Sequence, residues 1–235
     1  MGQAIIVRRV IIPIALVWIL VLSSFAQTDT QKLDAVLKSM DAAAANFHSA
    51  EANFVWEQYQ RAVDETDTQS GTVYYRRNGN NIEMMADVKQ PDHKLVLYKD
   101  GRLQVFQPKI DQVMEYSAGA NRNELESYLV LGFGGSGQDL TKSFDVTYQG
   151  EENIDNKPAA KLQLIPKSQK VRANFATIFL WIDLARGVSL QQKFMQAQGD
   201  SRTAKYSNIK IPAKIGNDVF QLKTDKKTQF VSPRG

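Results

Sequence analysis

The spacing of apolar residues predicts one amphipathic helix near the start of the chain. Between Thr30 and Phe47 apolar side chains recur every three or four positions, which is the period of one helical face. Asp29 or Thr30 is the expected N-cap, because both side chains can accept a hydrogen bond from the first turn. The helix therefore has one face to bury against another element.

Beyond this helix the apolar period changes to two, which is typical of β-strands. Short turn sequences such as Asn78-Gly79-Asn80 and Lys99-Asp100-Gly101 separate the runs, so neighbouring strands should be antiparallel. The expected strands are residues 50–61, 71–77, 81–89, 94–99, 102–107, 112–117, 144–151, 157–166, 175–183, 188–195, 201–211 and 218–224, with a tail ending at Val231.

The middle of the chain breaks the strand pattern. Residues 123–131 carry Leu125, Tyr128 and Leu129 at helical spacing, and a glycine-rich stretch and a polar turn, residues 132–137 and 138–142, follow. The simplest interpretation is a short helix on a flexible tether. Such a helix could be a movable lid or a fixed part of the structure.

These elements predict a mainly β fold of the α+β kind. We expect a single incomplete, strongly curved antiparallel β-barrel with helices packed into its concave side. Residues 175–182 are apolar on both parities, so part of the sheet should be covered on both faces. Either a helix covers one face and another strand or a loop covers the other, or one face lines a ligand cavity.

The N-terminal segment has the organisation of a secretory signal peptide. Arg8 and Arg9 precede an apolar run of about 13 residues, and Ser24-Phe25-Ala26 offers small residues for cleavage after Ala26. The run is shorter than the roughly 20 residues that span a bilayer, so an uncleaved anchor is the less favoured alternative. We expect residues 1–26 to be removed and residues 27–235 to form one soluble, exported domain.

Composition fits a globular protein and narrows its chemistry. The 235 residues are 43% hydrophobic and 23% charged, enough to build a core. The net charge of +4 includes the two leader arginines, and acidic and basic residues are interleaved, so nucleic acid is not an expected partner. The absence of cysteine excludes disulfides, thiolate metal sites, a cysteine nucleophile and a lipidated N-terminal cysteine.

No arrangement of residues indicates catalysis, a metal or a cofactor. The glycine-rich stretch lacks a phosphate-loop ending, and Ser136 lacks the spacing of a nucleophile elbow because Gln138 replaces the second glycine. His48 and His93 have no metal-binding spacing, and adjacent acids such as Asp64-Glu65 point in opposite directions. We therefore expect no enzyme; a secreted hydrolase using Ser136 or a carboxylate pair is the least favoured hypothesis.

The order of several short motifs resembles a known family. Asn53-Phe54, Gly71 to Arg77 (GTVYYRR), Gln90-Pro91-Asp92, Lys99-Asp100-Gly101 and Phe106 to Val113 follow the helix as they do in LolA-type periplasmic carriers of outer-membrane lipoproteins. The similarity extends over nearly the whole mature chain. It implies an incomplete antiparallel barrel closed by helices, with an apolar hollow that takes lipoprotein acyl chains.

The same resemblance implies a role for one arginine and for the short helix. Arg77 falls where the family has an arginine that ties a helical lid to the sheet and is needed for cargo release, and Arg76 offers a competing alignment. Leu125, Tyr128 and Leu129 would belong to that lid. Asn78 replaces the proline usual after the arginine, and residues 223–227 stand where many members have a Pro-Gly turn.

A carrier of acyl chains needs a dry, apolar wall, because each methylene exposed to water costs about 0.8 kcal/mol. One parity of the strands supplies such side chains, although aromatic residues on strands are more often plain core. The predicted lining residues are Phe54, Trp56, Tyr75, Met84, Ala86, Val88, Leu97, Phe179 and Trp181.

The leading hypothesis is a monomeric periplasmic chaperone that carries acylated lipoproteins from the inner to the outer membrane. Its expected partners are the lipoprotein cargo, an inner-membrane ABC exporter and an outer-membrane acceptor. The alternative is a binding module on the same scaffold for another lipid, or a regulator of envelope stress that contacts a membrane protein.

Overall fold

A computed structural model describes residues 15–79, 81–117 and 131–232. The helical elements are α1 (Ala15–Ala45), η1 (Pro108–Ile110), α3 (Gly137–Ser143), α4 (Gln169–Asn174) and η3 (Asn217–Phe220). The strands are β1 (Ser49–Gln60), β2 (Glu65–Asn78), β3 (Asn81–Gln90), β4 (Lys94–Lys99), β5 (Arg102–Gln107), β6 (Gln112–Ser117), β7 (Phe144–Ile154), β8 (Lys157–Pro166), β9 (Thr177–Asp183), β10 (Ser189–Met195), β11 (Ser201–Lys210) and β12 (Gln229–Val231).

All twelve strands form one sheet in the order β12-β6-β5-β4-β3-β2-β1-β11-β10-β9-β8-β7. Neighbouring strands are antiparallel except for β12, which runs parallel to β6. The pairing of β1 with β11 joins two meanders, and β12 and β7 remain as separate edges. The sheet is therefore not closed, which confirms the predicted incomplete antiparallel barrel.

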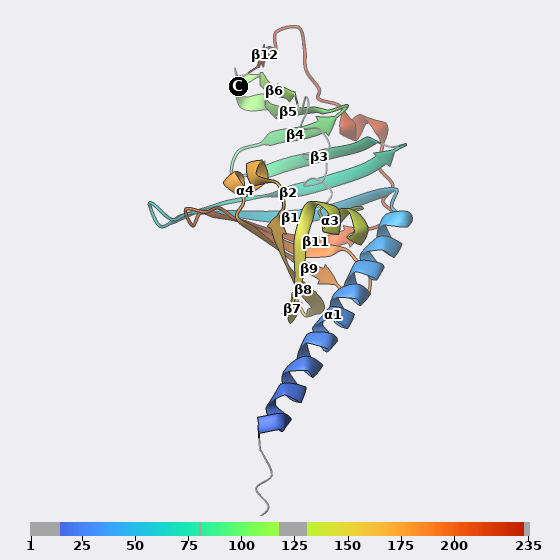
Figure 1. Cartoon of the computed structure of the whole chain (residues 1–235). Coiled ribbons are helices and arrows are strands. Elements are labelled where there is room, and N and C mark those ends of the chain that lie inside the picture. Colours follow the sequence, from blue (N-terminus) through green and yellow to red (C-terminus); the bar gives the residue numbers. More distant parts are fainter. Residues whose placement is uncertain (1–14, 80, 118–130, 233–235) are drawn as a thin grey trace, which may run out of the picture.

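The sheet bends strongly along its width. In Figure 1 strands β2 to β5 run nearly across the view, whereas β7 to β9 run steeply downward from the other half of the sheet. The bend gives the sheet one concave face. Side chains that share this face can be identified from the strand register, because directly paired residues point to the same side.

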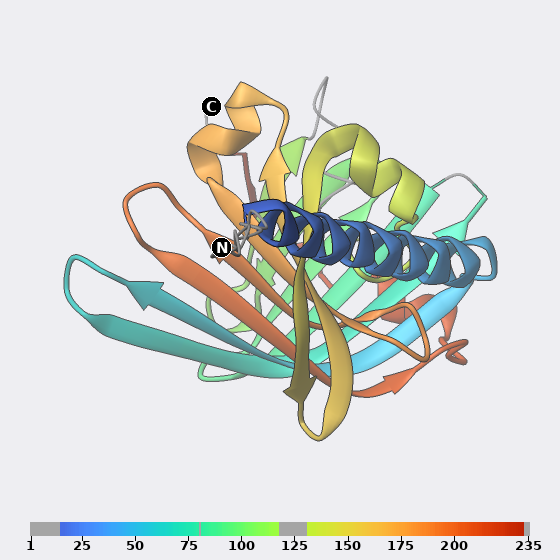
Figure 2. The ribbon, with the colours of Figure 1, turned by 60° about the horizontal axis from the view of Figure 1, so that its bottom comes forward.

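Helix α1 lies across the concave face of the second half, on the same side as α3, with which it is in contact (Figure 2). Its buried residues are Val36, Met40 and Ala44, at the spacing of one helical face. Val36 and Met40 belong to a cluster around Ile178, Leu180 and the other apolar side chains of β8 and β9 that share their face. The amphipathic helix was thus correctly predicted from its period.

The structure corrects the predicted N-cap and the type of two predicted elements. Helix α1 begins at Ala15 and not at Thr30, so Asp29 and Thr30 are helical residues and not an N-cap. The expected polar turn at residues 138–142 is helix α3, which Ser136 caps by accepting a hydrogen bond from the Asp139 amide. Residues 218–224 form no strand; they contain most of the 3₁₀ turn η3 instead.

The η3 turn is explained by a tertiary contact that no local pattern reveals. Phe220 is 1% exposed and packs with Met85 and Leu97 on the convex face of the sheet. The Arg76 guanidinium lies 4.3 Å from the centre of the Phe220 ring, donates to Glu83 Oε2 at 2.8 Å and donates to Asn217 Oδ1 at 2.6 Å. The C-terminal segment thus covers part of the convex face.

Among the residues that the structure describes, no helix is both long and apolar enough to cross a membrane.

Candidate functional site

Aromatic and aliphatic side chains form a continuous apolar surface on the concave face of the first half of the sheet. Phe54 pairs with Tyr206 of β11, and Tyr75 pairs with Met84 of β3, so the members of each pair point the same way. This surface belongs to one cluster that includes six of the predicted lining residues. Those six are Phe54, Trp56, Tyr75, Met84, Ala86 and Val88.

A short segment of the chain, residues 131–134, lies on this surface. We call it the plug segment. Its Phe133 side chain is 0% exposed; the ring stacks on Tyr75 at a centroid distance of 5.2 Å and meets Tyr206 edge-on at 4.9 Å. Burial raises the pKa values of both tyrosines, so these remain neutral phenols. The protein's own Phe133 thus occupies the middle of the apolar surface.

Backbone carbonyls attach the plug segment to the sheet from two sides. The Ser189 amide donates to the Gly132 carbonyl at 2.9 Å, and the Gln192 amide group donates to the Leu131 carbonyl, both from β10. On the other side Arg77 of β2 donates to the Gly134 carbonyl at 2.8 Å. Gln192 is buried and also accepts from the Tyr206 hydroxyl at 3.4 Å, so its polar atoms are satisfied.

Two glycines allow the plug segment to approach the sheet this closely. Gly132 and Gly134 have φ values of +80° and +84°, in the region that favours glycine. A Cβ atom on Gly134 would lie 2.6 Å from the Phe47 ring, and one on Gly132 would lie 2.1 Å from Ser189 Cβ. Only glycine fits both positions without displacing a neighbour.

Arg77 connects three parts of the structure. Besides its bond to Gly134, its guanidinium donates to the Ala44 carbonyl at the end of α1 at 3.0 Å and lies 5.7 Å from the Phe47 ring centre. Arg76 points to the opposite face and holds the C-terminal segment. The structure therefore places Arg77, and not Arg76, between the sheet, helix α1 and the plug segment.

An open hollow of about 380 Å³ lies on the same concave face. Trp56 and Met84, two of the predicted lining residues, form part of its wall. The other apolar lining residues are Val96, Leu103 and Val105, and the polar ones are Gln58, Asp67, Gln69, Lys94 and Arg202. A hollow of this size is at the lower end of the range for small-molecule sites.

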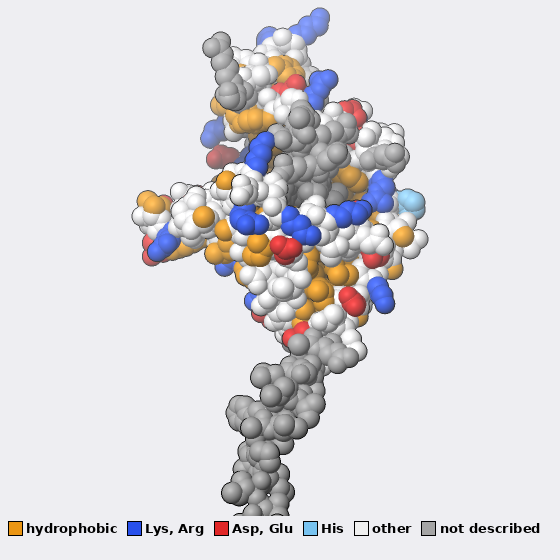
Figure 3. All heavy atoms as spheres, in the orientation of Figure 1, with side chains coloured by type: hydrophobic (Ala, Val, Ile, Leu, Met, Phe, Trp, Pro, Cys, Tyr) orange, Lys and Arg blue, Asp and Glu red, His pale blue; other side chains and the backbone are white. Residues whose placement is uncertain are grey.

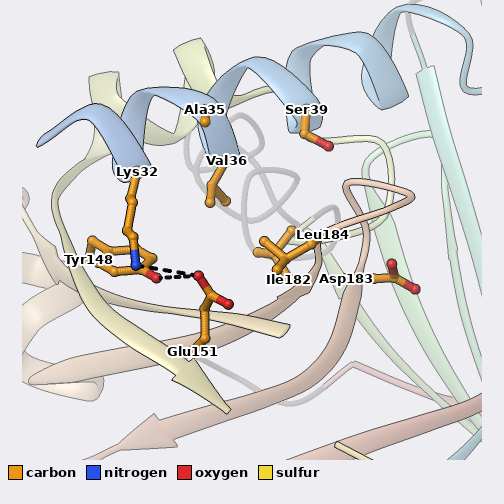
Figure 4. A pocket seen from close by; sticks show the side chains of 9 residues that line it. All are labelled: Lys32, Ala35, Val36, Ser39, Tyr148, Glu151, Ile182, Asp183 and Leu184. Atoms are coloured by element: carbon orange, nitrogen blue, oxygen red, sulfur yellow. Dashed lines mark hydrogen bonds and ion pairs between the residues drawn. The ribbon is translucent and has the colours of Figure 1, made fainter. Parts of the chain in front are cut away.

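A second, smaller hollow of about 180 Å³ lies beneath helix α1 (Figure 4). Val36 and Ile182 give it an apolar side. At its other side Lys32 reaches from the helix to Glu151, 3.6 Å away, and lies 5.5 Å over the Tyr148 ring. Tyr148 and Glu151 raise the pKa of this exposed lysine, and the contact adds a weak surface attraction between the helix and β7.

Apolar side chains also reach the outer surface. In Figure 3 they come to the surface in the lower half of the domain, where β7 to β9 and α1 lie in Figure 1. Charged side chains of both signs are interspersed with them.

Three predicted lining residues point away from the concave face. Leu97 pairs with Met85 and packs under Phe220 on the convex side, because Tyr98 and not Leu97 shares the face of Met84. Phe179 and Trp181 lie in a separate convex cluster with Leu190, while Leu180 faces helix α1. These three residues therefore lie on the convex face and not, as predicted, on the concave one.

On that convex face a polar group holds Trp181. Its indole nitrogen donates to Glu152 at 2.6 Å, and Lys161 lies 2.8 Å from the same carboxylate and 5.1 Å over the indole. The Lys161 hydrogen bond, followed by that of Trp181, holds the pKa of Glu152 below its usual range.

Leu125, Tyr128 and Leu129, the predicted lid residues, lie outside the described residues. Phe133 and Gln192 are residues of this site that were not predicted from the sequence. Phe133 could have been noticed as a single aromatic residue between two glycines in a polar stretch. Nothing in the sequence distinguishes Gln192 from the other glutamines of the chain.

Within residues 15–79, 81–117 and 131–232, no three His, Asp or Glu side chains come together in a way that could hold a metal ion. The site therefore consists of apolar walls, hydrogen-bonding side chains and a few charges.

Comparison with known proteins agrees with the fold. The fold is similar to the crystal structure of MucB, with a TM-score of 0.52 and 15% identity over 82% of this chain and 63% of that one. It is also similar to an uncharacterized conserved protein from Thermus thermophilus, with a TM-score of 0.52 and 14% identity over 87% of this chain and 99% of that one. These likenesses concern the fold alone. No curated protein matches the sequence.

The sequence model of the outer membrane lipoprotein carrier protein LolA matches residues 45–223, which include every strand from β1 to β11 and the plug segment. The chain therefore belongs to the LolA family.

Proposed function

We propose that this protein is an exported carrier that shields the acyl chains of lipoproteins while they cross the periplasm from the inner to the outer membrane. The observation that carries the proposal is the apolar concave face, which is open at the hollow and otherwise covered by the tethered Phe133. A chain of about 14 methylenes left in water would cost on the order of 11 kcal/mol, so a carrier needs such a surface.

The position of Arg77 supports a role in release. Its hydrogen bonds hold the plug segment and the end of α1 in the arrangement in which Phe133 occupies the apolar surface. A ligand that displaces Phe133 competes with these bonds. Arg77 therefore favours the arrangement without ligand, and this preference drives the release of cargo.

Export by the N-terminal segment is part of the same proposal. Residues 1–26 would be removed as a signal peptide, and residues 27–235 would form the single mature domain. The contacts described between α1 and the rest of the protein begin at Lys32 and Leu33, so cleavage after Ala26 would remove none of them. An inner-membrane ABC exporter would supply the cargo to a monomeric carrier, and an outer-membrane acceptor would receive it. The carrier itself would need no catalytic residue and no cofactor.

The test is transfer of a labelled, acylated lipoprotein from the purified protein to outer-membrane vesicles. Arg77→Leu removes two charge-assisted hydrogen bonds, to the Gly134 and Ala44 carbonyls, that stabilise the arrangement with Phe133 on the apolar surface. The variant should still take up cargo but release it about tenfold or more slowly. Arg102→Leu removes an exposed arginine on the convex face of β5 and should release cargo at the wild-type rate.

Release by Arg77→Leu at the wild-type rate would contradict the assigned role.

Mass spectrometry of an organic extract of the native, detergent-free protein separates the proposal from its alternative. Acylated peptide supports the lipoprotein carrier. Another lipid without acylated peptide supports the binding module for a different ligand.

A further inference from the structure

Two cationic side chains stand beside the apolar wall of the open hollow. Lys94 of β4 and Arg202 of β11 both line it. Both point to the concave face, because their paired residues Val88 and Gln58 lie on that face. The bend of the sheet brings the two cations toward one space, which Trp56, Met84 and Leu103 also line.

Neither cation has an ionic partner in the part of the chain that the structure describes. Arg202 donates one hydrogen bond, to Gln58 Oε1 at 3.1 Å, and no described carboxylate lies within ion-pair distance of it or of Lys94. In contrast, Lys109 beside this region pairs with Asp92, and Lys205 near Arg202 along the chain pairs with Glu57. Among these four cations, the two that face the hollow are the ones without an ion-pair partner.

The surroundings of the two cations disfavour their charge in the absence of a ligand. Burial, followed by the charge of Arg202, lowers the pKa of Lys94, and burial lowers the pKa of Arg202 although part of that side chain reaches solvent. Asp67 lines the hollow too, but it is exposed and accepts a hydrogen bond from Gln60 at 2.9 Å. The charge of Asp92 raises the pKa of Lys94, and Asp92 pairs with Lys109 at 3.5 Å. The charged side chains that line the hollow, Lys94, Arg202 and Asp67, together leave one positive charge for a ligand to neutralise.

We propose that the open hollow binds an amphiphile with an anionic oxygen headgroup, whose phosphate or carboxylate contacts Lys94 and Arg202 while its acyl chain lies on Trp56, Met84 and Leu103. This inference rests on the proposed function and adds a charge requirement to it. Charged oxygens accept strongly from lysine and arginine, and an apolar wall next to them suits a chain attached to the same headgroup. A free anion would gain nothing from that wall, and a neutral lipid would gain nothing from the cations.

The experiment measures binding of two lysolipids with the same acyl chain by titration calorimetry, below their micelle concentrations and with the full chain. Lysophosphatidylglycerol carries a net negative charge, and lysophosphatidylcholine is zwitterionic. The double variant Lys94→Gln/Arg202→Gln should bind the anionic lipid about tenfold or more weakly, as expected for the loss of charge-assisted hydrogen bonds. Its affinity for the zwitterionic lipid should stay within about twofold of the wild type.

The matched control is Arg102→Gln/Lys205→Gln, which removes two positive charges from strands β5 and β11 on the convex face. This variant should bind both lipids as the wild type does, so that a general effect of net charge is separated from the local site. Thermal unfolding of each variant checks that it remains folded.

Several results would overturn the inference. One is an unchanged affinity of Lys94→Gln/Arg202→Gln for the anionic lipid, or an equal loss for both lipids. Another is binding of inorganic phosphate as tight as that of the anionic lipid, which would indicate a site for free anions. If the wild type bound neither lipid, the apolar hollow itself and hence the proposed function would fail, whereas equal binding of both lipids would remove only the headgroup site.

Discussion

Phe133 fills the place that a ligand would take on the concave face. Its ring contacts Tyr75 and Tyr206, and these two aromatic neighbours are fixed by strands β2 and β11. The packing stabilises the plug segment and at the same time makes the apolar surface inaccessible at that point. Phe133 therefore stabilises the plug segment and at the same time reduces access to the apolar surface.

Replacing Phe133 by alanine should separate the two effects. Loss of a fully buried phenyl ring should lower the free energy of unfolding by about 3–5 kcal/mol, measured in urea. The same change should increase the binding of an acyl chain or of a hydrophobic dye, because the vacated surface remains apolar.

Phe230→Ala provides the control, because this side chain is 58% exposed at the edge of the sheet. It should change the unfolding free energy by no more than about 0.5 kcal/mol and leave dye binding unaffected. A Phe133→Ala variant that bound less dye than the wild type, while folded, would show that Phe133 is part of the binding surface.

At the scale of elements, the plug segment depends on backbone geometry. Its three carbonyls accept hydrogen bonds from β2 and β10, and two glycines at positive φ let it lie against Phe47 and Ser189. Such a segment is held at both ends and can leave only if several bonds break together.

Gly134→Ala should lower the free energy of unfolding by more than the cost of placing an alanine at positive φ. Gly79 also has positive φ, at +60°, but a Cβ there would meet nothing within 4 Å. Gly79→Ala should therefore cost about 1–2 kcal/mol of unfolding free energy from the backbone alone.

Gly134→Ala should cost at least about 2 kcal/mol more, because its Cβ must displace the buried Phe47 ring. Hydrogen exchange at the plug segment should also become faster in Gly134→Ala and not in Gly79→Ala. Equal losses of stability in the two variants would contradict the close packing described here.

Most of the strands could be predicted from the sequence. The alternating period and the turns identified eleven of the twelve expected strands, because antiparallel hairpins are local structures. Residues 218–224 were misassigned since their conformation depends on the distant Arg76 and Met85. Neither partner can be recognised from the local pattern.

The faces of Leu97, Phe179 and Trp181 were wrong for a related reason. Both faces of these strands are covered, one by helix α1 or the plug segment and the other by η3 or by the Glu152–Lys161 pair. Apolar residues therefore occur on both parities, and the period gives no preference for one face. The resemblance to a known family drew attention to Arg77, because a sequence motif fixes the place of a residue along the chain. Phe133 belongs to no such motif and could not be recognised without the fold.

At the scale of the whole molecule, the sheet keeps two free edges. β12 covers the edge of β6, where Thr228 donates to the Asp111 carboxylate at 2.8 Å and the Gln229 amide donates to the Asp111 carbonyl at 3.0 Å. This short parallel strand is itself exposed and packs little. Its main effect is to occupy hydrogen-bonding groups that could pair with another chain.

A chain that ends at Lys227 should keep its fold and its lipid binding but associate with itself more strongly. The reason is that the uncovered edge of β6 offers unpaired backbone groups to a second molecule. Sedimentation velocity over a range of concentrations would detect the association. A chain that ends at Ser232 keeps β12 and should sediment like the full protein, and a monomeric Lys227 chain would contradict the protective role of β12.

The attachment of the plug segment through carbonyl oxygens has a consequence for exchange with cargo. An acylated peptide also carries ester and amide carbonyls, which are acceptors of the same kind. If such a molecule replaced the segment, Gln192 and the Ser189 amide would find equivalent acceptors and would not be left unsatisfied in an apolar setting. The Arg77 bonds would then be the main polar difference between the self-occupied and cargo-occupied forms, and their loss would oppose the gain from the fit of the greasy chains.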